Sequence, residues 1–296
     1  MKRCVALGFF DGVHIGHARL LRSTAAAARS RGVSACALTF DTHPASLLTA
    51  PTPLLNTAGE RAEMMTELCG IDEVLTLPFD DELMNTPWHG FLENTLAGRY
   101  ECVFAAAGED FRFGFRAEGD SALLKTACAE LGMGCEIIPT VGLGGMAVSS
   151  TYIRTLVLKG DMEEAGRFLG HWHVMSGTVE HGRHFGEPLG FPTANFPVSR
   201  EVLCPAHGVY ASDAVTGGAR YAAVTNIGTR PTVAGTDTAV TVETHIPGFS
   251  GDLYGKRLRV ELKKYLRRER KFADMAALAE QLAKDTALAT GYAARL

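Results

Sequence analysis

The first half of the chain alternates short apolar runs with segments of helical pattern, and this alternation limits its possible folds more than any other feature. The helical segments have suitable stop residues, since Gly32 and Gly70 close the first two. Strands separated by helices predict a parallel sheet wrapped by helices, an α/β fold. The strand candidates are Cys4–Leu7, Val33–Phe40, Val74–Leu77, Cys102–Ala107 and Glu136–Val141. The helical candidates are Ala18–Arg31, Arg61–Cys69, a segment that opens at Thr86-Pro87, and Ser121–Leu131.

The pattern changes in the second half. A short helix from Gly160-Asp161 to about Gly170 is the expected connection between two domains. Beyond it, short strand-like runs with turn signals predict a small antiparallel β-barrel, and Asp274 caps a closing helix that starts at Met275. The strand-like runs are Val174–Val179, Val209–Val215, Tyr221–Asn226, Val240–His245 and Leu258–Leu262.

Length and composition exclude several classes of protein. A chain of 296 residues, 46% apolar and 21% charged, suits two ordinary globular domains. The net charge of −4 gives no basic excess for binding nucleic acid. No run reaches the roughly 20 apolar residues of a membrane span, and the chain enters its first strand without a signal-peptide pattern. We therefore expect neither a nucleic-acid nor a membrane partner.

The cysteines argue against a metal or redox motif. The 7 cysteines are scattered, mostly within apolar runs, and none forms a C-x-x-C pair. An odd number of scattered thiols fits a reducing compartment, so the expected location is the cytoplasm.

Residues 8–17, Gly-Phe-Phe-Asp-Gly-Val-His-Ile-Gly-His, place His14 and His17 where the first strand passes into the first helix. A helix start offers free N–H groups and the positive end of the dipole, which suit phosphate. Two imidazoles three residues apart can lie on one face and meet charge that builds up on a phosphoryl group. The alternative is that each histidine is structural or solvated. Gly12 and Gly16, which let a ligand approach the backbone, favour a binding site.

Three further segments follow predicted strands, at the sheet edge where such folds bind ligands. Thr39 to Pro44 follows the second strand, Gly108 to Gly114 the fourth, and Ser149 to Arg154 the fifth. The last group places hydroxyls at a helix start with an arginine one turn on. It is either an N-cap beside a solvated arginine or a clamp for a triphosphate.

Two sites in the second half suggest chemistry. Thr193 and Asn195 lie two residues apart on extended chain and hence on one face, and their oxygens could share a Mg²⁺ with ATP phosphates. The alternative is a turn, which Pro192, Thr193 and Asn195 favour. Glu243, in an alternating β-rich run, is either a general base or a surface charge.

These segments together resemble one family. Residues 8–17 look like the H-x-G-H signature of the nucleotidyltransferase superfamily, in the form found in bacterial bifunctional riboflavin kinase/FAD synthetases. In the first half, Phe40 to Pro44, Gly108 to Gly114 and Ser149 to Arg154 resemble three further motifs of that family, in order. In the second half, Gly177 to Asn195 looks like the flavokinase opening that ends in Pro-Thr-Ala-Asn. The later matches are Gly208-Val209-Tyr210, Asn226 to Thr232, Val242 to His245, Asp252 to Gly255 and Lys271-Phe272.

The resemblance implies a Rossmann-like nucleotidyltransferase domain over residues 1–157, a linker helix over 158–172 and a flavokinase-like barrel over 173–296. It implies phosphorylation of riboflavin to FMN and adenylylation of FMN to FAD with release of pyrophosphate, with ATP as co-substrate and Mg²⁺ as cofactor. The implied catalytic residues are His14, His17 and Glu243, and the implied metal ligands are Thr193 and Asn195. The implied ATP-binding residues are Gly8, Phe10, Asp11, Gly16, Ser149, Ser150, Thr151, Arg154, Gly177, Gly182 and Gly186. The implied flavin-binding residues are Asp41, His43, Asp110, Phe113, Gly114 and Arg230.

Three positions depart from the family pattern. Phe9 stands where the family often has asparagine, Thr42 where proline is usual, and Glu187 where arginine or lysine is usual. These departures leave open a chain that has kept only one of the two activities. A non-enzymatic flavin-binding protein and a transferase of the same fold that acts on another phosphate ester are two further hypotheses.

Overall fold

The computed structural model describes residues 1–43, 52–181, 190–231 and 238–293. The chain divides into two compact units. The first comprises Met1–Thr52 and Ala58–Ser150, and the second comprises Pro53–Thr57 and Thr151–Leu296.

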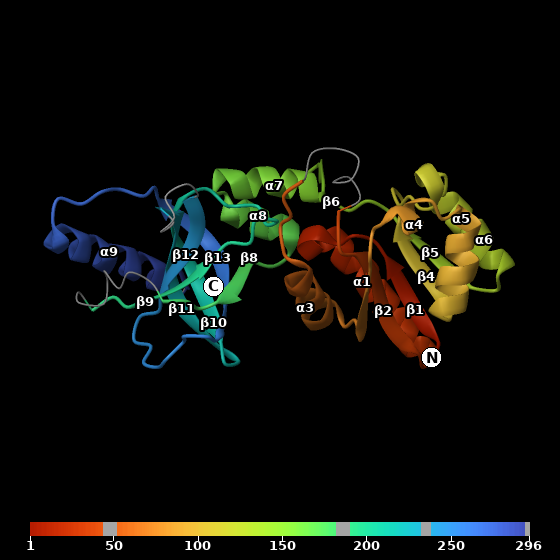
Figure 1. Ribbon diagram of the computed structural model, residues 1–296, viewed down its shortest axis with the longest axis horizontal. Coiled ribbons are helices and arrows are strands. Elements are labelled where there is room, and N and C mark those ends of the chain that lie inside the picture. Colours follow the sequence, from red (N-terminus) through yellow and green to blue (C-terminus); the bar gives the residue numbers. More distant parts are fainter. Residues whose placement is uncertain (44–51, 182–189, 232–237, 294–296) are drawn as a thin grey trace. The chain divides into compact units, whose positions relative to one another are not determined.

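The first unit is built on a five-stranded sheet in the order β3-β2-β1-β4-β5, and all four strand pairings are parallel (Figure 1). The chain lays down β1 to β3 toward one edge and then returns to add β4 and β5 on the other side of β1. The strand order therefore reverses between β1 and β4. At the carboxyl ends of these two strands lies a switch point, where folds of this kind bind ligands. The strands are β1 (Arg3–Leu7), β2 (Ser34–Phe40), β3 (Glu73–Leu77), β4 (Cys102–Gly108) and β5 (Gly134–Ile138).

Local sequence explains where the helices of this unit begin and end. The His14 side chain caps the start of α1, and Gly32, in the left-handed region at φ 65°, donates its N–H to Ala28 and Arg29 at the end. Asp120 likewise accepts from Leu123 N at the start of α6. The helices are α1 (Ile15–Arg31), α3 (Ala58–Cys69), α4 (Asp81–Met84), α5 (Trp88–Gly90), which continues as a π-helix over Phe91–Arg99, and α6 (Ser121–Glu130). A small hairpin, β6 (Gly142–Leu143) and β7 (Met146–Ala147), precedes α7.

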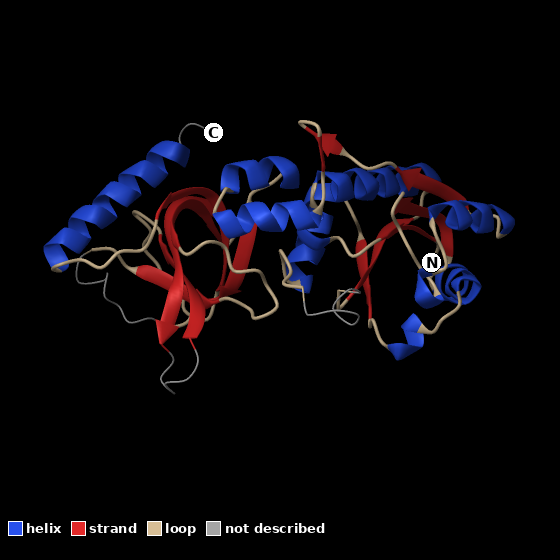
Figure 2. Cartoon of the chain, turned by 90° about the horizontal axis from the view of Figure 1, so that it is seen from above, coloured by secondary structure: helices blue, strands red, loops and turns tan. Residues whose placement is uncertain are grey.

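The second unit is a curled antiparallel sheet (Figure 2). Its strand order is β8-β13-β10-β11-β12-β9. A bridge between Glu180 and Asn195 brings the β8 end of the sheet to β9, so the sheet closes toward a barrel. Its strands are β8 (His173–Thr178), β9 (Thr193–Pro197), β10 (Gly208–Thr216), β11 (Ala219–Pro231), β12 (Thr238–His245) and β13 (Arg257–Arg267). The helices are α7 (Ser150–Lys159), whose first residue belongs to the first unit, α8 (Met162–Leu169) and α9 (Met275–Ala293).

The expected fold class is confirmed in both halves, a parallel sheet with helices followed by a small antiparallel barrel with a closing helix. The Asp161 and Gly170 caps lie at the two ends of α8, where the sequence predicts a short helix. One barrel strand is missing from the sequence prediction: Thr193–Pro197, expected only as extended chain, is strand β9. The short strands β6 and β7 are not predicted either. None of the helices in the described residues combines the length and hydropathy needed to cross a membrane.

The closing helix is tied to the barrel by one buried acid. Asp285 of α9 is 1% exposed and accepts from Arg267 of β13, with Nη2 2.7 Å from Oδ2. Gln281, one turn earlier on α9, donates to the same carboxylate at 2.7 Å. Ala289 and Tyr292 of α9 pack further along the same outer face, on Val209, Ala211 and Val224. The buried ion pair between Asp285 and Arg267 therefore fixes the position of α9 on the barrel sheet.

The interior of the barrel holds an unusual histidine. His173 of β8 is 1% exposed and lies opposite Leu262 of β13. Within the part of the chain that the structure describes, neither ring nitrogen of His173 has a hydrogen-bond partner. Burial of the ring, followed by repulsion from His171, lowers the pKa of His173 to about 3.

We expect the second unit to lose stability as the pH falls from 6.5 to 5, in part because of His173. The unfolded chain binds a proton on this ring below about pH 6.5, whereas the folded chain does so only near pH 3. The free energy of unfolding therefore falls by about 1.4 kcal/mol per pH unit, or by about 2 kcal/mol over this range. Urea unfolding at pH 7 and pH 5 measures the loss. The His173→Phe variant should show a flatter pH dependence, and equal slopes in both proteins would contradict the assignment.

Candidate active sites

The turn from β1 to α1 is held in a tight, left-handed backbone path. Phe10 has φ 59°, Gly12 φ 78° and Val13 φ 42°, and the two non-glycine residues are 1% exposed. Such φ values are uncommon for side chains larger than glycine and are found preferentially at functional sites. A Cβ on Gly16 would lie 3.2 Å from the His14 ring, so Gly16 allows that ring to lie against the start of α1.

The two histidines of the turn form a stacked pair. Their ring centroids are 3.6 Å apart and the planes differ by 13°. His14 Nδ1 accepts from the backbone N–H of His17 at 3.2 Å, so in the neutral ring the proton of His14 is on Nε2. The buried Phe10 ring meets the His17 ring edge to face at a centroid distance of 5.4 Å, so Phe10 packs against the histidine. The two imidazoles therefore lie together at the switch point of the sheet, as the sequence predicts.

His17 is held in its neutral form. Burial, followed by the nearby His14 ring and Arg61 guanidinium, keeps the pKa of His17 well below its usual value. The residue as a whole is half-buried, but Nδ1 is shielded from solvent, and no described group hydrogen-bonds to it. A neutral imidazole offers one N–H donor, which suits hydrogen bonding to a phosphoryl oxygen.

Arg61 is a residue of this site that the sequence did not single out. It lies in α3, is 1% exposed, and donates from Nη2 to the Phe40 carbonyl at 3.1 Å. Its guanidinium carbon lies 4.3 Å from the centroid of the Phe9 ring, and the Phe9 and His43 rings meet edge to face at a centroid distance of 4.6 Å. The Phe9 departure therefore creates an aromatic platform between Arg61 and His43. The sequence shows only that Arg61 lies at the start of a predicted helix. That position does not indicate that its side chain is buried.

The other predicted residues of the first unit fall in several places. Asp41 Oδ1 accepts from Phe79 N at 3.0 Å, so this carboxylate braces the loop after β3. Ser150 Oγ donates to the carbonyl of Asp11 at 2.9 Å, which joins the start of α7 to the histidine turn. Ser149 directly precedes α7 and is half-buried, and a Cβ on Gly8 would lie 2.9 Å from the Phe10 ring.

Thr151 and Arg154 belong to the second unit. Both lie on α7, and Arg154 is one turn beyond Ser150. Arg154 Nε donates to the carbonyl of Pro53 at 2.9 Å.

An apolar cavity of about 490 Å³ lies in the first unit. Phe113 is buried, and its ring stacks on Phe111 at 5.7 Å and tilts against Phe91 at 5.7 Å. Gly114 has φ 77°, and a Cβ there would lie 2.7 Å from Trp88 Cα, so only glycine fits. Phe113 and Gly114 both line the cavity, whereas Asp110 is exposed and does not. Flat aromatic walls of this kind suit a flat aromatic ligand.

In the second unit, strand register gathers the predicted kinase residues. Glu243 of β12 is paired with Asn195 of β9 on one side and with Asn226 of β11 on the other. His245 of β12 is paired with Thr193 of β9. Paired residues of antiparallel strands lie on one face, so these five side chains form a continuous polar block. Asn195 Nδ2 donates to the Thr193 carbonyl at 3.0 Å and to its hydroxyl at 3.3 Å.

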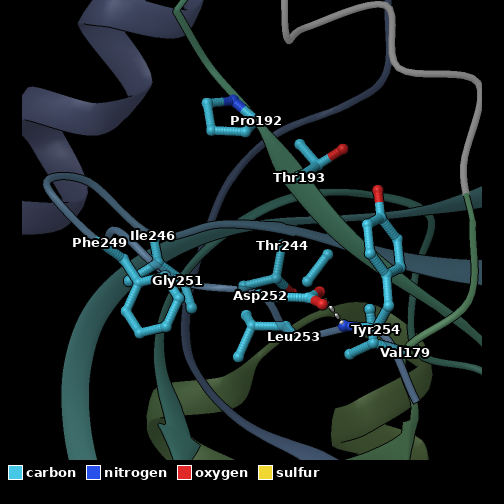
Figure 3. A pocket seen from close by; sticks show the side chains of 11 residues that line it. Val179, Pro192, Thr193, Thr244, Ile246, Phe249, Gly251, Asp252, Leu253 and Tyr254 are labelled. Carbon is cyan, nitrogen blue, oxygen red and sulfur yellow. Dashed lines mark hydrogen bonds between the residues drawn. The ribbon is translucent and has the colours of Figure 1, made fainter. Parts of the chain in front are cut away.

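Two cavities meet at this block. The larger, about 420 Å³, is walled by Thr193, Asp252 and Tyr254 among others (Figure 3). Asp252 Oδ1 accepts from the Tyr254 backbone N–H at 2.9 Å, and the Tyr254 ring stacks on His181 at 3.9 Å. The smaller, about 190 Å³, lies on the side of α9, and Glu243, His245 and Asn226 line it together with Thr193. Thr193 is thus the residue that lines both.

Asn195 is 4% exposed and does not line either cavity, although its amide contacts Thr193, which lines both. The remaining predicted residues also contribute no described side chain to these cavities. Gly177 lies in β8, where a Cβ would lie 2.5 Å from the Phe196 ring, so its glycine is needed for packing. Arg230 lies in β11, and only its backbone is described. Gly182, Gly186 and the departure Glu187 lie outside the described residues.

Two family models match successive parts of the chain, FAD synthetase over residues 1–152 and riboflavin kinase over residues 169–293. The bifunctional riboflavin kinase/FMN adenylyltransferase of Escherichia coli K12 is 37% identical over 95% of this chain and 90% of its own length. The protein of that name from Pseudomonas fluorescens is 36% identical over 99% of this chain and 94% of its own. The one from Bacillus subtilis is 31% identical over 100% and 94%.

A solved structure has the same fold throughout. The crystal structure described as a macrolide-efflux protein from Streptococcus pneumoniae matches with a TM-score of 0.83 and 28% identity, over 98% of this chain and 94% of that one. The fold and the two sites define a transferase in which a nucleotidyltransferase-type sheet and a flavokinase-type barrel share one chain. The chain belongs to the bifunctional riboflavin kinase/FMN adenylyltransferase family.

Proposed function

We propose that the chain catalyses two successive reactions at separate sites. The barrel transfers the γ-phosphate of ATP to the ribityl 5′-hydroxyl of riboflavin, which gives FMN and ADP. The first unit transfers AMP from ATP to the FMN phosphate, which gives FAD and pyrophosphate. The observation that carries the kinase assignment is the position of Thr193 between two cavities, because a phosphoryl group must pass from one substrate to the other.

The larger barrel cavity is the proposed nucleotide site, with Tyr254 at its wall, and the smaller one receives the ribityl chain. Thr193 and Asn195 offer hard oxygen donors that fit Mg²⁺, an ion that takes one or two protein ligands and completes its shell with phosphates and water. No group of three or more His, Cys, Asp or Glu side chains in the described residues forms a competing metal site. When bound, Mg²⁺ neutralises charge on the phosphates.

Glu243 is the proposed general base of the kinase. It lines the smaller cavity next to Asn195, on the side from which the riboflavin hydroxyl would approach. Its half-buried carboxylate would accept the hydroxyl proton as the oxygen attacks the γ-phosphorus. Asn226 of β11, which is paired with Glu243 of β12, lines the same cavity and donates to Glu269 at 3.0 Å.

The adenylyltransferase needs no strong base, because the FMN phosphate is already a nucleophile. We assign His14 and His17 to hydrogen-bond the α-phosphoryl group as charge develops on it. The phenylalanine-walled cavity would hold the isoalloxazine through Phe113 and Phe111, with Gly114 in its wall. Asp110, which lies outside the cavity lining, would contact the flavin from the exposed loop after β4. Gly8, Asp11 and Gly16 would shape the backbone that faces ATP, and Asp41 and His43, which follow β2, would contribute to the flavin site. Ser149 and Ser150 would hold the β- and γ-phosphates.

Incubation of the purified chain with riboflavin and MgATP, followed by chromatography of the flavins, tests the proposal. FMN should appear first and then FAD, with ADP and pyrophosphate as the other products. FMN without FAD would show that only the barrel is active, and FAD formed only from added FMN would show the reverse. Bound but unchanged riboflavin would identify a flavin-binding protein and overturn both assignments.

A further inference from the structure

His245 lies beside the proposed metal site but has no part in the two reactions as described so far. It is 8% exposed, is paired with Thr193 across β12 and β9, and lines the smaller barrel cavity. Its ring is tilted against Phe191 with a centroid distance of 5.1 Å, and its Nδ1 lies 2.9 Å from the carbonyl oxygen of Pro192.

The hydrogen bond fixes the tautomer of this histidine. A carbonyl oxygen only accepts, so His245 Nδ1 must carry the hydrogen and donate it. In the neutral ring this leaves Nε2 without a proton. The Nδ1–H form is therefore held by one defined contact, and the ring cannot turn over without losing that contact.

The bond acts on the residue that precedes Thr193. The Pro192 carbonyl belongs to the peptide unit that carries the Thr193 N–H, so the His245 ring holds the orientation of that peptide. From the other side, the Asn195 amide holds the Thr193 carbonyl at 3.0 Å and its hydroxyl at 3.3 Å. Thr193 is thereby fixed from both directions at the point where both cavities meet.

We propose that His245 is a positioning residue for the magnesium–nucleotide site, and that it acts by holding the Pro192–Thr193 peptide through Nδ1–H. The inference rests on the proposed roles of Thr193 and Asn195. Partners that orient metal ligands usually contribute about 10–100-fold to metal affinity or activity. The expected effect of losing the bond is of that size and falls on MgATP more than on riboflavin.

Three substitutions of His245 distinguish the contribution of Nδ1 from that of Nε2. In His245→Asn the side-chain amide N–H would lie near the position of Nδ1, whereas the longer amide in His245→Gln would reach toward Nε2 instead. We expect His245→Ala and His245→Gln to raise the KM for MgATP and lower kcat/KM of riboflavin phosphorylation about 10–100-fold. His245→Asn should recover most of the loss. The exposed His207 gives a matched control, and His207→Ala should leave the kinetics unchanged.

Two measurements do not depend on turnover. Long-range ¹H–¹⁵N spectra of the imidazoles should show His245 as the Nδ1–H tautomer, and the Kd for MgADP from calorimetry should rise about 10–100-fold in His245→Ala with the same thermal midpoint of unfolding. An Nε2–H tautomer, recovery by Gln instead of Asn, or a wild-type Kd in His245→Ala would overturn the proposal. If wild-type protein bound MgADP but phosphorylated no riboflavin, the proposed kinase reaction would fail, while the tautomer and the Kd would still decide the role of His245.

Discussion

Replacing Glu243 with glutamine lowers FMN formation by about 10²–10⁴-fold, the usual effect of removing a general base. Glutamine keeps the size and hydrogen-bonding reach of the side chain but cannot take a proton from the ribityl hydroxyl. The KM values for riboflavin and MgATP should change little, because the cavity keeps its shape and the Thr193 side chain in its wall. Initial rates of FMN formation under saturating substrates measure the effect.

The same variant carries its own control, because the other reaction uses residues of the first unit. FAD formation from supplied FMN should stay within about twofold of wild type. Glu243 is half-buried and lies on the outer face of the barrel, so the thermal midpoint of unfolding should also be preserved. Near-normal FMN formation by Glu243→Gln would refute the assignment of Glu243 as the general base, and Glu243 would then be a surface carboxylate.

The parts of the fold that follow local rules are predictable from the sequence. Alternating apolar runs and helical segments foretold the parallel sheet, and capping residues such as Gly32, Asp161 and Gly170 fixed helix ends because they act on adjacent backbone groups. The histidine turn was predictable for the same reason, since His14 and His17 are three residues apart and their stacking depends on one helix start.

The kinase site was only partly predictable, because it depends on strand register. Asn195, Glu243 and Asn226 come from three strands far apart in the sequence, and only the pairing of β9, β12 and β11 places them side by side. Strand β9 itself begins beside Pro192 and has only five residues, so its local signal matches that of a turn. A one-residue slip of β12 would turn Glu243 and His245 to the opposite face.

Burial of charge was the feature that the sequence concealed. Arg61 is charged and follows Glu60 near the start of a helix, where a solvated side chain is the ordinary expectation. Its position under Phe9 and against the Phe40 carbonyl comes from the packing of α3 near the end of β2. Burial of the His17 ring, followed by the His14 ring and then by the Arg61 guanidinium, lowers the pKa of His17, so its electrostatic state depends on packing and not on local sequence alone.

Replacing His17 with alanine should reduce FAD formation from FMN and ATP by about 10²–10³-fold, the scale of one lost transition-state donor. The imidazole N–H would hydrogen-bond the α-phosphoryl oxygen most strongly as charge develops there, so kcat should fall more than the KM values rise. Phosphorylation of riboflavin should be unchanged. The exposed His89 of the same unit is the matched control, and His89→Ala should retain full activity.

The pH dependence gives this prediction a second, independent check. Because the pKa of His17 lies well below its usual value, the ring stays neutral from pH 8 down to pH 6, and its N–H donor is present throughout. The ratio of wild-type to His17→Ala rates should therefore be constant over this range. A ratio that changes toward pH 6 would mean that the wild-type ring gains a proton there, which would contradict the neutral state. An equal loss of FMN and FAD formation would contradict two separate sites. His17→Asn, which restores an N–H donor in a shorter side chain, should regain part of the rate if hydrogen bonding is the role of the residue.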